Sequence, residues 1–577
     1  MPHTTIRSAT ASARMTASLM VAGAGSRSRP PSRLASSSRT ASTTSSALTS
    51  ATAAASAASP PHLSDGPFDP YNCITSRLPT TASAGDAART PRDGRPLAGW
   101  DVAVKENICV LGAATTCSSR MLSDYASTFD AACVHRLRNA GATIAAKTNC
   151  DEFGMGSENV HSFHGPVRNP AKAVRDAAPR PEPAAAAAWD LERERVAGGS
   201  SGGSAAAVKA GLARIAIGTD TGGSIRLPAA YCGVVGLKPS YGLVSRWGLV
   251  SYADSLDTVG VLGSGIDDVE AAFDVLSAPD ARDPTCVDAS ARRRAEGAVA
   301  AALDVASSST TNGGGVVEGL RIGIPREYFP RELHPRVLAP FRAAVHRLRE
   351  QGAHIVSVSL PTTPYALSAY YVISSAEASS NLARYDGVEY GYRASAVEGQ
   401  SPQQEQQHPY ARTRSQGFGA EVQRRILLGT YALSADKFDN YFLQAGRIRR
   451  EIQRDFATSL RIPSVLGHGV AASPLSADKD KDGVDVLLHP SAVDTAPTLA
   501  SALGFGPRAG TAQERQDRIL SSYVQDVLTV PASLAGLPAI SLPVGEAEDD
   551  GWPVGVTATS QWGCEKILFR IGRALAL

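Results

Sequence analysis

Two short clusters rich in glycine and serine most constrain what this chain can fold into, because they require tight backbone turns at fixed places. Residues 198–204 read GGSSGGS, and residues 220–226 read DTGGSIR. Lys105 lies upstream, in the segment VAVKEN of residues 102–107. Glycine lacks a Cβ atom, so both clusters can bring backbone amides close to a substrate. One lysine and two glycine-framed serines are the residues that activate a serine nucleophile without histidine.

Lys105, Ser200 and Ser224 are the predicted catalytic residues. A serine hydroxyl becomes a good nucleophile only when a base takes its proton, and an ammonium group cannot act as that base. Burial among apolar neighbours such as Val102 and Val104 would favour the neutral amine of Lys105. If Lys105 lies beneath Ser200 and Ser200 beside Ser224, the proton passes from Ser224 through Ser200 to Lys105.

The backbone of the second cluster is the predicted oxyanion hole. Its residues are Thr221, Gly222, Gly223 and Ser224, which follow one another in the sequence. Backbone N–H groups gathered in one concave loop stabilise the negative charge that develops on a substrate oxygen.

Other interpretations of these motifs are weaker. Residues 198–202 fit the G-x-S-x-G elbow of α/β-hydrolases, which also needs a preceding strand and a later aspartate and histidine. Residues 220–222 echo an aspartic protease motif, but no second copy exists to share the proton. Residues 478–483 begin like a calcium loop, yet His489 stands at the twelfth position, where a bidentate glutamate is needed. Either glycine cluster alone would be an ordinary tight turn.

Composition bounds the class of protein. Of 577 residues 43% are hydrophobic, which is enough for a large core. The net charge of +2 predicts no strong electrostatic field, so it neither demands nor excludes a nucleic-acid partner. The eight cysteines form no C-x-x-C pair, which favours reduced thiols in an intracellular compartment and argues against structural zinc. No apolar stretch approaches the length of a membrane span, so we expect a soluble protein without a membrane partner.

The N-terminal segment differs in kind from the remainder of the chain. Residues 1–64 are rich in serine, alanine and threonine, with six arginines and no acidic residue. Such a segment buries too little apolar surface to fold, and its composition is typical of a mitochondrial transit peptide. A merely disordered tail is the alternative. The folded domain is expected over residues 65–577, with surface insertions near 171–188 and 473–483.

The alternation of short β-branched runs with longer helical patterns predicts an α/β fold. Strands are expected at residues 100–104, 142–146 and 215–218, and helices at 131–140 and 204–210. Residues 421–456 carry apolar side chains at helical spacing and are expected to form helices packed on the sheet. Loops at the strand ends would then carry the chemistry.

The motifs resemble those of the amidase signature family. The resemblance rests on the spacing of 24 positions between Ser200 and Ser224, and on the segments TDTGGSIRLP at 219–228 and CGVVGLKP at 232–239. It implies a large mixed central β-sheet covered by helices. It also implies that Ser224 is the acyl-accepting nucleophile, that Ser200 is the bridging serine, often preceded by a cis peptide, and that Lys105 is the base.

Further segments are similar to the A subunits of the glutamyl-tRNA amidotransferases within that family. They include KTNCDEFGMGSEN at 147–159 and RRILLGTYALS at 424–434. The implied function is that of a glutaminase, which cleaves glutamine to glutamate and ammonia. The ammonia would reach a partner subunit, where it would amidate glutamate mischarged on glutamine tRNA, in the mitochondrial matrix.

The resemblance also implies partners and cofactors. The expected partners are a small third subunit and the amidotransferase B subunit, with Glu-tRNA(Gln) contacted mainly through the partner. No cofactor or metal is expected in this subunit. ATP and Mg²⁺ are expected in the partner subunit.

Arg425 and Asp526 are the predicted substrate-binding residues. Free glutamine carries a carboxylate and an ammonium, so its site needs one fixed cation and one fixed anion. Arg425 offers a planar fork for the carboxylate. Asp526, in the segment YVQDVL at 523–528, aligns with the acidic residue that meets the amino group in the family. On residue type alone Arg425 would be a surface arginine of a helix.

Two other functions stay open at this point. The first is a stand-alone amidase of small aliphatic or aryl amides, whose pocket would have no use for the charges of Arg425 and Asp526. The second is a non-catalytic scaffold subunit, which would not need Lys105, Ser200 and Ser224 together.

The sequence also departs from the family pattern. Only residues 66–100 separate the presumed transit peptide from the catalytic segment, where the family has a longer helical region. Ser533 stands where asparagine is common, and Thr557 where glutamine is common.

Overall fold

The computed structural model describes residues 69–79, 94–172, 190–308, 316–395, 410–466, 483–504 and 512–576. The predicted transit peptide at 1–64 and nearly all of the two predicted insertions lie outside these ranges. The division of the chain into leader, domain and insertions therefore stays a prediction.

Within the described residues, eleven strands form one mixed sheet in the order β1-β3-β2-β4-β6-β5-β10-β11-β9-β7-β8. The strands are β1 (Ile74–Arg77), β2 (Asp101–Lys105), β3 (Thr143–Thr148), β4 (Ile215–Asp220), β5 (Val235–Lys238), β6 (Thr258–Gly263), β7 (Arg321–Pro325), β8 (His354–Val358), β9 (Val486–Pro490), β10 (Ala539–Glu546) and β11 (Pro553–Ser560). β2 is parallel to β3 and β4, whereas β4, β6, β5, β10, β11 and β9 pair antiparallel in turn. The predicted fold class is confirmed, and the predicted strands are found within two residues of their expected ends.

The central strands are buried on both faces. Every residue of β4, β6 and β11 is buried, including those that would face solvent in a two-layer protein. A strand covered by helices on both faces has a continuous apolar sequence, whereas a strand with one solvent-exposed face alternates apolar and polar residues. The sequence IAIGTD of β4 is of the first kind, which explains why its strand was recognisable.

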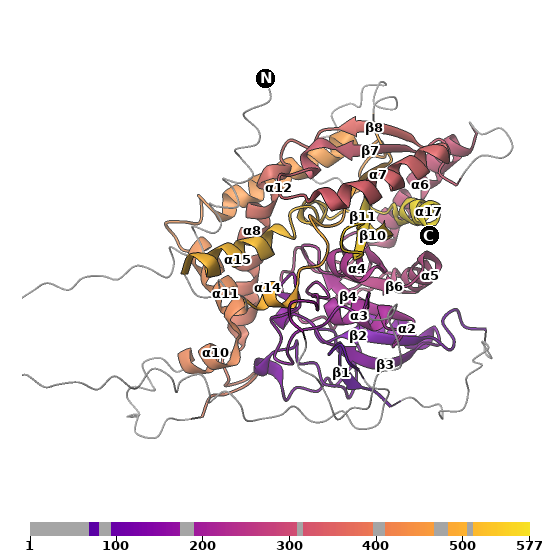
Figure 1. Cartoon of the computed structure of the whole chain (residues 1–577). Helices are drawn as coiled ribbons and strands as arrows, with labels where there is room; N and C mark the ends of the chain where they lie inside the picture. Colours follow the sequence, from indigo (N-terminus) through magenta and orange to yellow (C-terminus); the bar gives the residue numbers. More distant parts are fainter. Residues whose placement is uncertain are drawn as a thin grey trace, which may run out of the picture.

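Helices surround this sheet, some of them packed on the strands and others on neighbouring helices (Figure 1). They are α2 (Ala132–Asn139), α3 (Gly202–Lys209), α4 (Arg226–Cys232), α5 (Ile266–Leu276), α6 (Ala289–Ser308), α7 (Pro335–Glu350), α8 (Ala366–Asn381), α10 (Ala411–Gly417), α11 (Ala420–Ala432), α12 (Phe442–Ser459), α14 (Leu499–Leu503), α15 (Ala512–Val524), α16 (Val530–Ala535) and α17 (Glu565–Leu575). Short 3₁₀ turns occupy Arg120–Leu122, Glu152–Gly154, Arg326–Tyr328, Thr363–Tyr365 and Leu382–Arg384. α17 illustrates the packing, because it contacts β10 and β11 and buries Ile567, Leu568 and Ile571.

The helices of the 421–456 region exist as predicted, but the prediction that they pack on the sheet is wrong, because both pack mainly on other helices. α12 packs on α8 and α16, and α11 lies against α8, to the left in Figure 1. A Cβ atom on Gly429 would come within 1.9 Å of the carbonyl oxygen of Ser375, so glycine lets the two helices touch. Leu427 and Tyr431 are consequently exposed. Apolar spacing identified the helix, and the close approach at Gly429 decided which face is buried.

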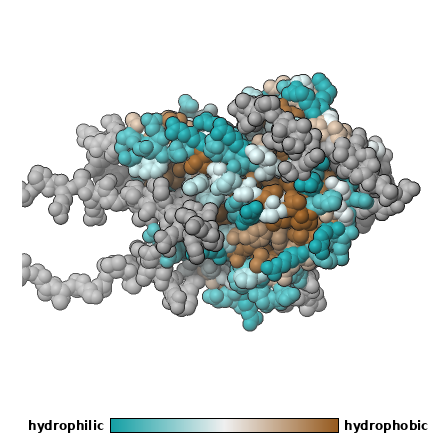
Figure 2. All heavy atoms as spheres, turned by 90° about the horizontal axis from the view of Figure 1, so that it is seen from above, coloured by the Kyte–Doolittle hydropathy of each residue, from teal (hydrophilic) through white to brown (hydrophobic). Residues whose placement is uncertain are grey.

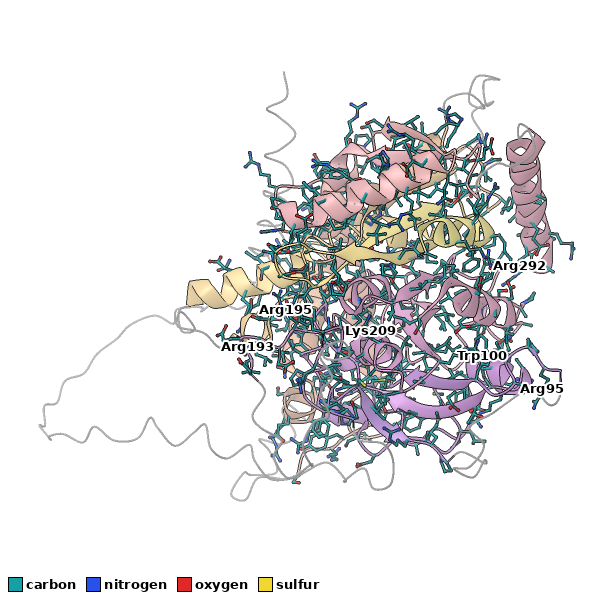
Figure 3. All side chains as sticks on the ribbon, turned by 45° about the vertical axis from the view of Figure 1, so that its right-hand side comes forward. Arg95, Trp100, Arg193, Arg195, Lys209 and Arg292 are labelled. Carbon is teal, nitrogen blue, oxygen red and sulfur yellow. The ribbon has the colours of Figure 1, made fainter. Side chains whose placement is uncertain are left out.

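The outer helix α6 packs Ala295 and Val299 into the core and is also held by the side chain of Arg292. Arg292, labelled near the start of this helix in Figure 3, donates from Nη2 to the carbonyl oxygens of Gly242 and Leu243 at 3.1 and 2.9 Å.

Seen from above, the molecule carries an area of hydrophobic residues bordered by hydrophilic ones (Figure 2). Among the described helices, none combines the length and hydrophobicity needed to cross a membrane.

Candidate active site

Lys105 is the last residue of β2 and is completely buried. Its Nζ lies 2.7 Å from Oγ of Ser200, 2.9 Å from Oγ of Ser201 and 3.0 Å from Oγ1 of Thr219. The structure therefore brings Lys105 and Ser200 together, as the sequence predicted. It adds Ser201 and Thr219, which the sequence reasoning missed.

Burial lowers the pKa of Lys105 from its usual value. The negative charge of nearby Asp151 and Asp220 acts in the opposite direction but does not outweigh the loss of solvation. The hydrogen-bond partners of Nζ are neutral hydroxyls, so no ion pair holds the proton on the nitrogen.

Ser200 follows a cis peptide bond with Gly199, the feature implied by the family resemblance. Gly199 packs closely on Asp151, where a Cβ atom would lie 2.0 Å from Oδ2. Asp151 in turn accepts hydrogen bonds from the backbone N–H groups of Asn159 and His161, at 2.9 and 3.0 Å. This buried carboxylate therefore anchors the loop that supports the first serine cluster.

Ser224 lies in the loop between β4 and α4, beside the first cluster. The backbone N–H of Ser201 donates to the carbonyl oxygen of Ser224 at 3.0 Å. The structure shows no hydrogen bond between the hydroxyls of Ser200 and Ser224, so it brings the two serines side by side without the direct link of the predicted relay. Ser224 is 7% exposed and Ser200 1%, which places Ser224 on the more accessible side.

The backbone N–H groups of Thr221, Gly222, Gly223 and Ser224 meet no acceptor in the described part of the chain. The two glycines are needed for close packing. A Cβ atom on Gly222 would lie 2.6 Å from the ring of Tyr370, and one on Gly223 would lie 2.3 Å from Oγ1 of Thr529. The segment is thus a tightly packed loop with four free donors.

A buried ion pair fixes the ends of this loop. Arg226 donates to both carboxylate oxygens of Asp220, at 3.0 and 2.9 Å, and both side chains are fully buried. Burial opposes ionisation of Asp220, but Arg226 outweighs it and lowers the pKa of this carboxyl. Arg226 also donates to the carbonyl of Thr529 at 2.7 Å and to Oγ of Ser533 at 2.8 Å. Ser533, which replaces the common asparagine, therefore still supplies an acceptor.

Arg425 is not the surface arginine that its residue type alone would suggest, because it is 2% exposed. Its Nε donates to Oε1 of Glu421 at 2.8 Å, and its Nη1 donates to the hydroxyl of Tyr252 at 2.6 Å. The guanidinium also lies over the rings of Tyr252, Tyr371 and Tyr523, 5.1 to 5.9 Å from their centroids. Nη2 makes no hydrogen bond with a described residue. We call these five residues the Arg425 cluster.

Asp526 lies in the turn between α15 and α16 and is buried. Its Oδ2 accepts from the hydroxyls of Ser157 and Tyr371, at 2.8 and 3.0 Å. Burial raises the pKa of Asp526 to about 6, although Ser157, Arg425 and Tyr371 oppose the shift. Tyr371 touches both Arg425 and Asp526, so the structure gathers the two predicted substrate-binding residues around one tyrosine.

The group formed by Lys105, Ser200 and Ser224 is connected to the Arg425 cluster through neighbouring residues. Tyr370 of α8 packs on Gly222, and the neighbouring Tyr371 contacts Arg425. Thr529 packs on Gly223, and its hydroxyl donates to the carbonyl oxygen of Asp526 at 3.1 Å. Two positions of α8 and one turn of the chain therefore connect the nucleophile loop to both charged residues.

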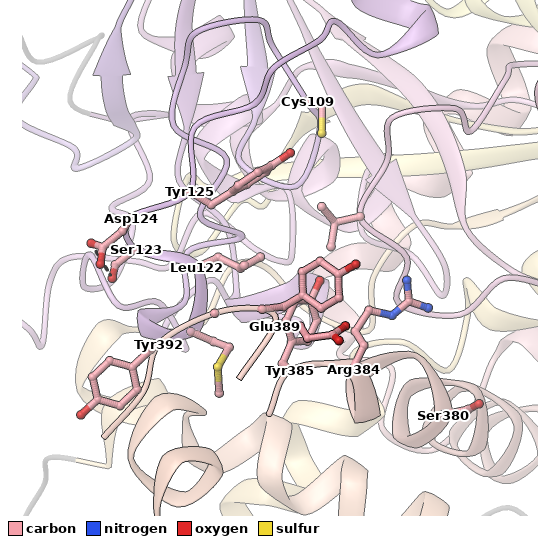
Figure 4. A pocket seen from close by; sticks show the side chains of 14 residues that line it. Cys109, Leu122, Ser123, Asp124, Tyr125, Ser380, Arg384, Tyr385, Glu389 and Tyr392 are labelled. Carbon is pink, nitrogen blue, oxygen red and sulfur yellow. Dashed lines mark hydrogen bonds between the residues drawn. The ribbon is translucent and has the colours of Figure 1, made fainter. Parts of the chain in front are cut away.

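A cavity of about 730 Å³ lies elsewhere, between the loop that follows β2 and residues 384–392 (Figure 4). Tyr125, Arg384 and Tyr385 line it, and none of the predicted site residues does. This cavity is therefore separate from the predicted active site.

The described residues contain no group of three or more histidine, cysteine, aspartate or glutamate side chains that could hold a metal ion. All eight cysteines are described and carry free thiols, seven of them buried.

Several residues around the site were not identified from the sequence. Ser201 was overlooked because only one serine of the first cluster was assigned a role, and Thr219 because it precedes the second cluster. Ser157 lies within a segment that was recognised by resemblance, without a role of its own. Glu421 and Tyr371 meet Arg425 only in the folded chain, although the pair of tyrosines at 370 and 371 in an apolar helix was a usable signal.

Comparisons with known proteins agree with this geometry. A family model described as Amidase matches residues 71–178 and 184–569. The A subunit of the mitochondrial glutamyl-tRNA(Gln) amidotransferase of Mycosarcoma maydis is 55% identical over 511 residues, which cover 89% of each chain. The A subunit of the glutamyl-tRNA(Gln) amidotransferase of Roseiflexus castenholzii is 43% identical over 493 residues, 85% of each chain.

A solved structure extends the similarity to three dimensions. The crystal structure of the glutamyl-tRNA(Gln) amidotransferase A subunit from Thermotoga maritima superposes with a TM-score of 0.60 at 33% identity. The match covers 88% of this chain and 87% of that chain.

Proposed function

The chain belongs to the amidase family, and we propose that it is the glutamine-hydrolysing A subunit of a mitochondrial glutamyl-tRNA(Gln) amidotransferase. It cleaves glutamine to glutamate and ammonia, and the ammonia serves to convert Glu-tRNA(Gln) to Gln-tRNA(Gln). The names of the relatives and their coverage of nearly the whole chain support this function.

The observation that carries the chemistry is the contact of 2.7 Å between Lys105 and Ser200 inside the protein. A neutral lysine amine has two N–H donors and one lone pair. The hydroxyl of Ser201 donates to the carbonyl oxygen of Thr219 at 3.1 Å, and Oγ1 of Thr219 accepts from Asn107 at 3.1 Å. Both oxygens therefore suit the two amine donors. The lone pair is left for the hydroxyl proton of Ser200.

The proposed reaction begins when Oγ of Ser224 attacks the amide carbon of glutamine. The hydroxyl proton passes through Ser200 to Nζ of Lys105, and the carbonyl electrons move onto the oxygen. The free N–H groups of residues 221–224 would bind this oxyanion. The C–N bond then breaks, and the proton returns through Ser200 to the leaving nitrogen, which departs as ammonia. Water hydrolyses the remaining ester by the same route, releasing glutamate and restoring Ser224.

Arg425 and Asp526 are proposed to select glutamine. The unpaired Nη2 edge of Arg425 would bind the substrate carboxylate, and Asp526 would bind the ammonium. Pairing of Asp526 with an ammonium would also favour its ionised form, which burial disfavours.

The chain acts in the mitochondrion, like its relative from Mycosarcoma maydis. Its relatives are named as subunits of an amidotransferase, which implies a complex of several subunits. We propose that the partners are a small third subunit and a B subunit, and that Glu-tRNA(Gln) is held mainly by the B subunit. Hydrolysis in this chain would need no cofactor, and the B subunit would bind the ATP and Mg²⁺ used for amidation.

The two alternatives are less well supported. A stand-alone amidase of neutral amides gives no reason to bury Arg425 among three tyrosines. A scaffold subunit gives no reason to keep Lys105 in contact with Ser200, or the loop of Ser224 bonded to the first serine cluster.

Ammonia release from glutamine tests the proposal. The full chain is purified from mitochondria with its associated subunits, and the same complex carrying Ser224→Ala is the control. The wild type should release ammonia and the variant should not, with unchanged subunit composition. Ammonia release by the Ser224→Ala complex at a tenth or more of the wild-type rate would remove Ser224 from the mechanism.

A further inference from the structure

Glu421 is a buried carboxylate one helical turn before Arg425, and the mechanism above does not use it. It is 4% exposed. Its Oε1 accepts from Nε of Arg425 at 2.8 Å and from the hydroxyl of Tyr523 at 3.0 Å, and its Oε2 contacts Arg424. Four residues thus join in one network within the protein.

The orientation of Arg425 follows from this network. A guanidinium presents its donors along fixed edges, so two occupied positions determine where the third points. Glu421 takes Nε and Tyr252 takes one hydrogen of Nη1. Nη2 then makes no hydrogen bond with a described residue, and the guanidinium lies over the ring of Tyr371, whose hydroxyl donates to Asp526.

We propose that Glu421 is a positioning residue that holds Arg425 in the orientation that binds the carboxylate of the substrate. This inference rests on the proposed glutaminase function and extends it to substrate selection. Without Glu421, the carboxylate of Asp526 is open to Arg425, because both residues contact Tyr371. Pairing of Arg425 with Asp526 would consume both groups that glutamine needs.

The two arginines bound by Glu421 differ in a way that supports a positioning role. The side chain of Arg424 is 27% exposed, whereas that of Arg425 is 3% exposed. A partly exposed pair on a helix contributes little to stability.

Burial opposes ionisation of Glu421, but Arg425, His161 and Arg424 outweigh it and hold its pKa at about 2. The carboxylate is therefore charged at any pH at which the enzyme works.

The test compares glutamine with a small neutral amide as substrates of the intact complex. Glu421→Gln keeps the size and one acceptor of the side chain but removes its charge. We expect KM for glutamine to rise by about 10- to 100-fold, with kcat changed by less than about threefold. The loss in kcat/KM on the neutral amide should be much smaller, because that substrate has no carboxylate to align.

A double variant and a matched control sharpen the test. If Glu421 acts through Arg425, then Glu421→Gln combined with Arg425→Met should be no worse on glutamine than Arg425→Met alone. Glu451→Gln removes a carboxylate that pairs with Arg454 three residues along α12, on the surface. It should leave both substrates unaffected.

Three outcomes would overturn the inference. They are an unchanged KM for glutamine in Glu421→Gln, equal losses on both substrates, and multiplied losses in the double variant. A wild-type complex that hydrolyses the neutral amide but not glutamine would overturn the proposed function itself, and the positioning role with it.

Discussion

Lys105 and Arg425 are both buried basic side chains, yet their surroundings shift their pKa values in opposite directions. The pKa of Lys105 is lowered, because burial removes solvent and its partners are the hydroxyls of Ser200, Ser201 and Thr219. Burial acts on Arg425 in the same sense, but Tyr252 and Glu421 outweigh it, and its pKa is raised. Depth of burial is similar, so the chemistry of the partners makes the difference.

The comparison shows how one domain can hold both a catalytic base and an anchor for a charged substrate group. A base must be able to lose its proton, and hydroxyl partners allow this because they can donate as well as accept. An anchor for a carboxylate must never lose its charge, and Tyr252 and the carboxylate of Glu421 together favour the charged form of Arg425. Arg226 belongs to the second kind, because Asp220 pairs with it through two hydrogen bonds.

The largest expected effect comes from making the base permanently charged. Lys105→Arg places a guanidinium, which has no lone pair, against the hydroxyl of Ser200. We expect kcat/KM to fall on the order of 10³-fold or more on glutamine and on a neutral amide alike. Both rates are measured by ammonia release, and thermal unfolding checks that the domain is intact.

A neutral side chain of similar length at position 105 tests whether the charge or the shape of the residue determines activity. Lys105→Met should be as inactive as Lys105→Arg, since neither can accept a proton. An active Lys105→Arg enzyme would mean that a cation suffices at this position and that the contrast with Arg425 is wrong.

The next effect removes the anchor. Arg425→Met should cost about 2–5 kcal/mol of transition-state stabilisation on glutamine, because the substrate carboxylate and Glu421 lose a buried cation. The loss on a neutral amide should be far smaller, since Lys105, Ser200 and Ser224 keep their contacts. The measurement is kcat/KM for both substrates. Equal losses would assign Arg425 to the fold and leave the choice of substrate unexplained.

Much of the fold was predictable from local pattern. The apolar run of β4 and the glycine clusters identify their strand and turns from short stretches of chain. Lys105, Ser200 and Ser224 were selected from the order and spacing of three motifs and from the family resemblance, and their catalytic roles stay predictions. The structure places Lys105 in contact with Ser200 and the segment of Ser224 beside the first cluster.

The Arg425 cluster was only partly predictable, for a physical reason. A glutamate four residues before an arginine reads as an exposed helix pair, and only tertiary packing buries it. Tyr371 and Asp526 are 155 positions apart and meet through the fold. The exposure of Leu427 was missed likewise, because helical periodicity does not say which neighbour α11 packs against.

The smallest expected effect concerns pH and the partner of Arg425 in substrate binding. Asp526 has a pKa raised to about 6 by burial, so it is protonated below that pH and loses the charge that attracts an ammonium. The ratio of kcat/KM for glutamine to that for a neutral amide should be flat above about pH 7. It should fall by up to about tenfold per pH unit below about pH 6. Titration of Lys105 affects both substrates and cancels in this ratio.

Variants identify the group responsible. Charged or titratable groups that act on Asp526 include Arg425, Asp220 and Glu158, and Glu158 is itself buried with a pKa raised to about 7. Asp526→Asn should give a low ratio that no longer depends on pH. Glu158→Gln should keep the fall of the ratio below about pH 6. A flat wild-type ratio between pH 5 and 8 would exclude Asp526 as the ammonium site. Arg425, whose charge does not change in this range, would then remain the proposed charged determinant of glutamine binding.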